Sequence, residues 1–99
     1  MVIKWNWFAK NTVGEQFVEA VDSISANIAE GFGRYNKKDK IKFYRYSRGS
    51  TKEATDWNEK SHVRNLLKPD EYIHIAGELR SLPKEINLQI KLTNQKLAI

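Results

Sequence analysis

The chain contains no cysteine, only two prolines and a single methionine. Without cysteine it has no disulfide framework, no thiolate nucleophile and no Cys-ligated zinc. No apolar run approaches the roughly 20 residues that a membrane span needs. The opening MVIKWNWFAK lacks the long apolar segment of a signal peptide. These absences fit an intracellular protein, and we expect a cytoplasmic location.

What is present is typical of a small globular protein. The chain has 99 residues, of which 40% are hydrophobic and 29% are charged, so we expect one domain over residues 1–99. Apolar residues recur at helical spacing, which predicts four helical segments and no strands. Their expected ranges are about 2–10, 13–32, 36–66 and 69–96.

The second segment carries the clearest apolar stripe. Its members step by four, three, four and four residues, so they share one helix face; they are Phe17, Val21, Ile24, Ile28 and Phe32. Glycines near a helix end commonly terminate it, and we expect Gly31 and Gly33 to do so here.

The third and fourth segments carry start signals. Asn36 is a good N-cap with Asp39 three residues later, and Pro69 suits the first position of a helix. We expect one face of the third helix to hold Phe43, Ser47, Ser50, Ala54 and Trp57. In the fourth helix Pro83 should produce a kink or a division. Its inward residues should be Ile75 or Ala76, Leu79, Leu82, Ile86, Ile90 and Leu97.

Positive charge is concentrated between residues 34 and 52. Eight basic residues and one acid give this segment +7, against +5 for the whole chain, so the remainder carries −2. Five of the cations step by four, three, three and four residues and should share one helix face: Lys38, Lys42, Arg45, Arg48 and Lys52. Such a row can meet successive phosphates of a nucleic acid. The alternative is an ordinary solvated helix face.

Aromatic residues accompany the basic row. Tyr44 should border it, and Tyr44 or Tyr35 could stack on an unpaired base. Arg34 is a possible addition to the phosphate contacts. No helix-turn-helix or zinc module is visible, so sequence-specific readout is not expected.

The second helix also carries a polar face made of Ser23, Asn27, Glu30 and Arg34, which step by four, three and four residues. Two interpretations exist: a catalytic or ligand-binding cluster, or a packing and hydrogen-bond network between helices. We favour packing, because no nucleophile–base pair or metal ligand set accompanies these residues. The residues that we assign to helix or oligomer interfaces are Ser23, Asn27, Glu30, Gly31, Ser47, Gly49 and Ser50.

The two motifs SISANIAEGFGRY and YSRGSTKEA, joined by the basic run, resemble a bacterial four-helix bundle family. Its members include the proteins encoded in intervening sequences of large-subunit ribosomal RNA genes and the accessory proteins of diversity-generating retroelements. The resemblance implies homo-oligomeric rings, often pentamers. It also implies an association with structured RNA and, in retroelements, with a reverse transcriptase.

The chain departs from that family at its start, where relatives have a full-length leading helix. We therefore expect an all-α, up-and-down antiparallel four-helix bundle with a shortened first helix, in a homo-oligomeric ring. Part of the second helix's apolar face should then lack its usual cover, which increases the dependence on self-association.

These observations favour a non-enzymatic accessory protein that binds nucleic acid, RNA rather than DNA, through the basic row. The alternative is a protein–protein scaffold that docks an acidic partner such as a reverse transcriptase. An enzyme is the third hypothesis. No phosphate-binding glycine loop is present, and His62 and His74 lack neighbours at metal-ligand spacing. We therefore predict no cofactor and no metal.

Overall fold

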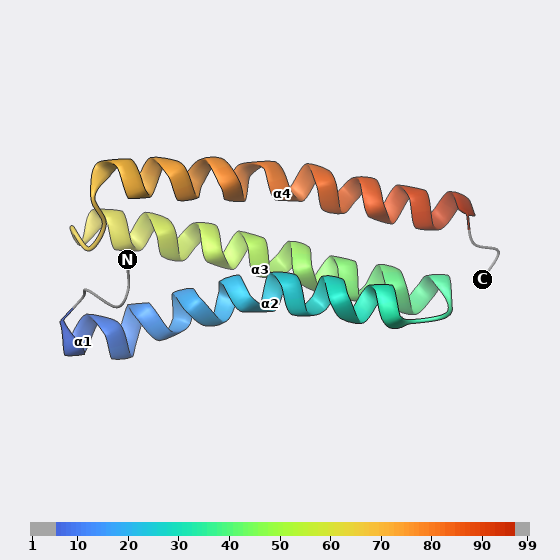
Figure 1. The fold of residues 1–99 in the computed structure, drawn as a ribbon, viewed down its shortest axis with the longest axis horizontal. Coiled ribbons are helices and arrows are strands. Elements are labelled where there is room, and N and C mark those ends of the chain that lie inside the picture. The colour runs from blue at the N-terminus through green and yellow to red at the C-terminus, as the bar shows by residue number, and fades with distance from the viewer. Residues whose placement is uncertain (1–5, 97–99) are drawn as a thin grey trace.

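The computed structural model describes residues 6–96, and this part of the chain is helical without any strand. Three long helices run up and down beside one another: α2 (Glu15–Gly33), α3 (Lys37–Val63) and α4 (Pro69–Lys96) (Figure 1). Their Cα atoms occupy 50 × 22 × 15 Å. The expected all-α, up-and-down arrangement is confirmed for this part of the chain, with three long helices in place of four.

The first predicted helix does not form a separate element among the described residues. The short helix α1 (Trp7–Ala9) passes through a π-helical turn, η2 (Lys10–Gly14), directly into α2. The residues that flank this turn, Ala9 and Glu15, both have right-handed helical backbone angles. No proline interrupts this stretch, so nothing forces a loop between the segments. The earlier part of the prediction, residues 2–5, lies outside the described residues.

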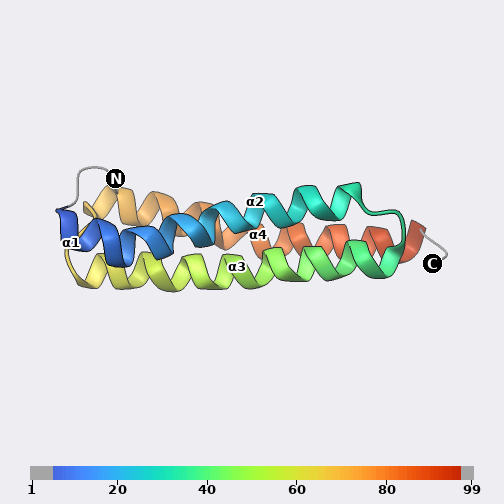
Figure 2. The same cartoon turned by 90° about the horizontal axis from the view of Figure 1, so that it is seen from below.

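The core forms where α3 packs against both neighbours, as the view turned by 90° shows (Figure 2). Its centre combines Ala20 and Ile24 of α2, Ala54 of α3 and Leu79 of α4. Half-buried apolar side chains surround this centre: Ile28, Trp57, Ile75 and Leu82. The predicted stripe of α2 is therefore only partly covered, since Phe17 is buried while Val21 is 42% and Phe32 is 61% exposed.

The buried face of α3 is rotated from the one that the sequence predicted. Ser47 and Ala54 are buried as expected, but Phe43, Ser50 and Trp57 are only half-buried. The buried row steps by three, four, three, four and three residues, which is the regular spacing of a helix seam: Tyr44, Ser47, Thr51, Ala54, Asn58 and Ser61. Small side chains at this seam let the helix backbones approach closely.

The buried hydroxyls of this seam are satisfied by backbone carbonyls. Ser47 Oγ donates to the carbonyl of Ile24 across the α2–α3 contact, at 2.8 Å. Thr51 and Ser61 donate within α3, to the carbonyls of Ser47 and Trp57. The expected face combined the aromatic residues Phe43 and Trp57 with two serines and an alanine, whereas burial usually favours apolar residues. The buried serine and threonine side chains are stable at this seam because their hydroxyls bond to backbone carbonyls.

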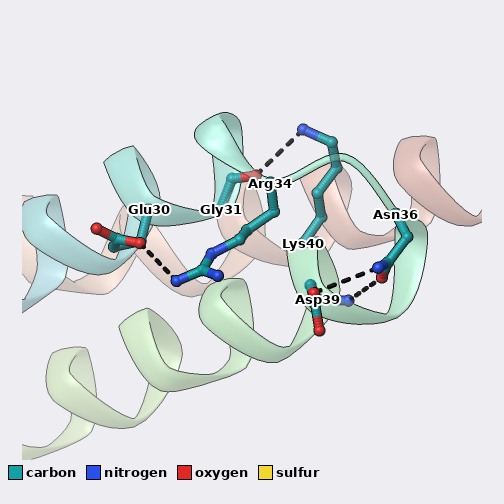
Figure 3. Close-up of polar contacts among 6 residues, drawn as sticks. All are labelled: Glu30, Gly31, Arg34, Asn36, Asp39 and Lys40. Carbon is teal, nitrogen blue, oxygen red and sulfur yellow. Dashed lines mark hydrogen bonds and ion pairs between the residues drawn. The ribbon is translucent and has the colours of Figure 1, made fainter.

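The connection between α2 and α3 is fixed by side-chain caps (Figure 3). Asn36 accepts a hydrogen bond from the backbone N–H of Asp39 at 2.9 Å, which confirms the predicted N-cap. Lys40 Nζ reaches back to the carbonyls of Gly31 and Phe32, both at 3.1 Å, at the C-terminal end of α2. A cation at that end also complements the helix dipole.

The end of α3 lies earlier than expected, and of the kink or division expected at Pro83 the division does not occur. Helix α3 ends at Val63, and Asn65 takes a left-handed backbone conformation with φ 59°. The N–H of Leu66 then bonds to the carbonyl of Ser61, and that of Asn65 to His62, which is a Schellman motif. Helix α4 continues through Pro83 without division.

Candidate nucleic-acid interface

The cations predicted to form a row lie on the side of α3 that is turned away from the buried seam. Successive residues are about 100° apart around a helix, which places the centre of the row roughly 140° from the seam. Lys38, Lys42, Arg45 and Lys52 are exposed, and Arg48 is half-buried. Among residues 6–96 the ion pairs are Arg34–Glu30 and Lys60–Asp56, so none of these five cations is neutralised by a carboxylate there.

Arg48 connects the row to α4. Its Nη1 donates to Oδ1 of Asn87 at 2.6 Å, which holds the guanidinium at the edge of α3. A fixed guanidinium loses less conformational freedom when it meets a phosphate than a free lysine does.

The neighbouring surface of α4 carries further cations that the sequence reasoning missed. Arg80, Lys84 and Lys91 are exposed and line, with Asn87 and the acidic Glu85, a shallow depression of about 570 Å³. Their spacing of four and seven residues places them on one helix face. This spacing is the sequence signal from which the α4 cations could have been predicted. We call the two rows together the basic surface: Lys38, Lys42, Arg45, Arg48 and Lys52 of α3, and Arg80, Lys84 and Lys91 of α4.

Arg34 lies beside the start of the row but is engaged locally. Its Nη2 is 3.0 Å from Oε2 of Glu30, and its guanidinium lies over the Phe43 ring at 4.7 Å. Lys42 Nζ lies 5.3 Å from the same ring. Arg34 therefore contributes to fixing the α2–α3 connection. Because Glu30 pairs with it, the local charge at Arg34 is less positive than at the members of the basic surface.

Tyr44 does not border the basic row. It is 2% exposed and packs edge-on against Phe32, with ring centroids 5.9 Å apart. Burial raises the pKa of its phenol. The prediction that Tyr44 stacks on a base is wrong, because the true seam of α3 includes position 44. Tyr35, at the α2–α3 connection, is 97% exposed and therefore accessible for stacking.

The residues assigned to helix or oligomer interfaces fall in two groups. Ser47 and Gly31 lie in the α2–α3 contact, where Ser47 bonds to Ile24 and Gly31 lies under the Tyr44 ring. Ser23, Asn27, Glu30, Gly49 and Ser50 lie at the surface or partly exposed. Asn27 Nδ2 donates to the Ser23 carbonyl within α2, at 2.8 Å, so it does not bridge two helices of the described chain.

A second polar cluster lies where α3 meets the start of α4. Tyr72 donates its hydroxyl to Oε1 of Glu59 at 2.5 Å, and its ring stacks on His62 at 3.9 Å. The hydrogen bond to Glu59, then burial and the Glu59 charge, raise the pKa of Tyr72. Nearby, Asn58 is 1% exposed, and its amide donates to the Tyr72 carbonyl at 3.3 Å. Sequence reasoning missed this cluster because its members come from two helices.

Among residues 6–96, no three histidine or carboxylate side chains come together as a metal site would require. Over the same residues, no helix combines the length and the apolar character needed to cross a membrane.

Comparison with known proteins identifies one family. The chain matches no curated protein and no solved structure. The family model described as 23S rRNA-intervening sequence protein matches residues 2–88. This match covers α2, α3 and the part of α4 up to residue 88, and it includes all of the basic surface except Lys91. The chain belongs to the 23S rRNA-intervening sequence protein family.

Proposed function

We propose that this protein binds nucleic acid without catalysing a reaction, and that RNA is its preferred ligand. The observation that carries the proposal is the basic surface: cations from α3 and α4 face outward together, and Arg48 bonds to Asn87 where the two rows meet. Such a surface binds phosphates and releases counterions from the nucleic acid.

The arrangement supports backbone contacts rather than base readout. Tyr44 is buried, so stacking on a base is left to exposed tyrosines outside the basic surface, Tyr35 and Tyr46. Contacts to phosphates position a protein but carry no sequence information. The proposed ligand is therefore recognised by its charge and shape. The preference for RNA is supported by the family's own description, which refers to 23S rRNA.

The proposal includes a homo-oligomer, with a ring of cytoplasmic subunits such as a pentamer. Support comes from apolar side chains that one chain leaves exposed, among them Val18 and Val63. Further support comes from the small residues Gly49 and Ser50 at the surface of α3. A ring would repeat the basic surface around its circumference and raise affinity through multiple contacts.

Charge reversal tests the proposal. In Lys42→Glu/Arg45→Glu, two exposed members of the basic surface change sign, and RNA binding should weaken with a shallower dependence on salt. The matched control is Lys10→Glu/Arg64→Glu, which changes net charge equally at exposed positions outside the basic surface. Gel shifts with RNA and with DNA at two salt concentrations measure both effects. If both variants weaken RNA binding equally, the effect is one of net charge, and the basic surface is not the binding site.

The second candidate is a scaffold whose basic surface docks an acidic protein, such as a reverse transcriptase. The burial of Tyr44 favours it, because the cations that remain suit any extended anionic surface. Co-purification that survives nuclease treatment, and that is lost in Lys42→Glu/Arg45→Glu, would support this candidate over RNA.

A further inference from the structure

A groove between α2 and α4 is an apolar feature that the proposed function does not use. Both helices pack against α3, and on the open side two adjoining hollows of about 430 and 270 Å³ lie between them. Leu82 lines both hollows. Val21 and Ile75 belong to the first, and Phe32 and Leu88 to the second.

The lining of this groove is spaced for a helix. Along α2 the apolar residues that face it are three to four positions apart, from Phe17 and Val21 to Ile28 and Phe32. Side chains at this spacing form ridges with grooves between them, and the side chains of another helix can pack into those grooves. Val21, Phe32 and Leu88 are 42%, 61% and 52% exposed, so an occupant would remove apolar surface from water.

The charges around the groove define the occupant. Asp22, Glu78 and Glu85 line its two hollows, together with His74, and no lysine or arginine does so. This is notable in a chain with 17 basic residues. Lysine and arginine flanks would pair with these carboxylates, whereas a second copy of the same groove would bring carboxylates against carboxylates.

We infer that the α2–α4 groove binds, in trans, an amphipathic α-helix whose apolar stripe is flanked by lysine or arginine. The apolar stripe enters between Val21 and Leu82, and the flanking cations meet Asp22 on one side and Glu78 and Glu85 on the other. The bound helix then lies across the core from α3, so that four helices surround one core. The groove borders the α4 part of the basic surface, since Glu85 and Leu88 line both its second hollow and the depression beside Lys84. The lining of the groove includes no member of the basic surface, so the inference does not depend on RNA binding.

The test uses two synthetic peptides of about 20 residues, which span about 30 Å as helices. Both carry leucines at heptad a and d positions; one has lysine at the flanking positions and the other has glutamine. Fluorescence anisotropy should show the lysine peptide binding about tenfold more tightly at low salt, with the difference shrinking as salt is added. Equal affinities, or no binding of either peptide, would overturn the inference.

Two variants locate the binding. Val21→Lys places a charge in the groove at a position that is already partly exposed, and it should weaken the lysine peptide by about tenfold or more. Ile73→Lys is the matched control, because Ile73 is an exposed β-branched residue that does not line the groove. Equal loss in both variants would overturn the inference.

Light scattering of the proteins without peptide tests whether a second copy of the chain occupies the α2–α4 groove. The mass of Val21→Lys should equal that of the parent chain, because assembly through other surfaces is untouched. A lower mass for Val21→Lys alone would show that another copy fills the groove, and would also overturn the inference.

Discussion

The ring of Tyr44 occupies the space where a side chain at position 31 would begin. A Cβ built on Gly31 would lie 2.5 Å from Tyr44 Cε1 and 2.9 Å from Cδ1. Gly31 is therefore a packing residue of the α2–α3 contact, and its backbone angle is not left-handed, since no described glycine has positive φ. The sequence had assigned Gly31 both to helix termination and to the residues of a helix or oligomer interface.

Gly31→Ala should destabilise the protein by about 1–3 kcal/mol, the usual cost of forcing extra volume into a packed contact. Gly77→Ala is the control, because a Cβ there meets nothing within 4 Å, and alanine stabilises an exposed helix interior by about 0.5–1 kcal/mol relative to glycine. Urea denaturation measures both. Stabilisation by both substitutions would mean that Tyr44 moves aside without cost.

Ser47→Ala should destabilise the protein by about 1 kcal/mol, because it removes the buried hydrogen bond to the Ile24 carbonyl and leaves that acceptor with one partner fewer. Ser47→Leu should be worse, since the seam between α2 and α3 has room only for small side chains. Ser50→Ala, at a half-buried position outside the seam, should change the free energy of unfolding by less than about 0.5 kcal/mol. A larger effect at Ser50 than at Ser47 would place the seam on the face first expected.

Asn36→Ala should reduce stability by about 1 kcal/mol through loss of the N-cap of α3. Asn36→Asp should retain most of the stability, because aspartate accepts the same N–H and suits the helix N-terminus. Thermal melts of the two variants provide the measurement. Equal melting temperatures for alanine and aspartate would show that the cap contributes little.

Arg80→Glu/Lys84→Glu should weaken RNA binding and reduce its salt slope, as expected for Lys42→Glu/Arg45→Glu on α3. The reason is that the α4 cations lie beside the α3 row at the Arg48–Asn87 bond and add phosphate contacts. Gel shifts at two salt concentrations check this. Wild-type affinity in the α4 variant would confine the interface to α3.

Alkaline pH should weaken the contact between α3 and the start of α4. The pKa of Tyr72 is raised in the folded protein, first by its hydrogen bond to Glu59. The folded state therefore holds this proton more tightly than the unfolded state. The resulting stabilisation is complete below the ordinary tyrosine pKa of about 10 and is lost as pH rises through the folded value.

Urea denaturation at several alkaline pH values, compared between the parent chain and Tyr72→Phe, isolates this contribution. The difference in unfolding free energy between the two should shrink as the pH rises through the folded pKa of Tyr72. A difference that stays constant with pH would show that Tyr72 stabilises the protein through its ring contact with His62 alone.

Several features could be predicted from the sequence because they depend on residues that are close together in the chain. The Asn36 cap depends on residues three apart, and Pro69 marks the start of α4. Helical periodicity gave the three long helices within a few residues at their ends. The stop of α3 was placed three residues late, because the left-handed turn at Asn65 is not marked by a glycine.

By itself the sequence determined the helical class, the family motifs and the concentration of positive charge in one segment, since all three are properties of residues close together in the chain. Only the tertiary structure decided which face of α3 is buried, because that choice depends on how closely α2 and α4 approach it. It also joined the α4 face that carries Arg80, Lys84 and Lys91 to the α3 row through the bond between Arg48 and Asn87. Finally, it left Val21 and Phe32 exposed in a groove, because α2 and α4 both pack on α3 and leave the space between them open.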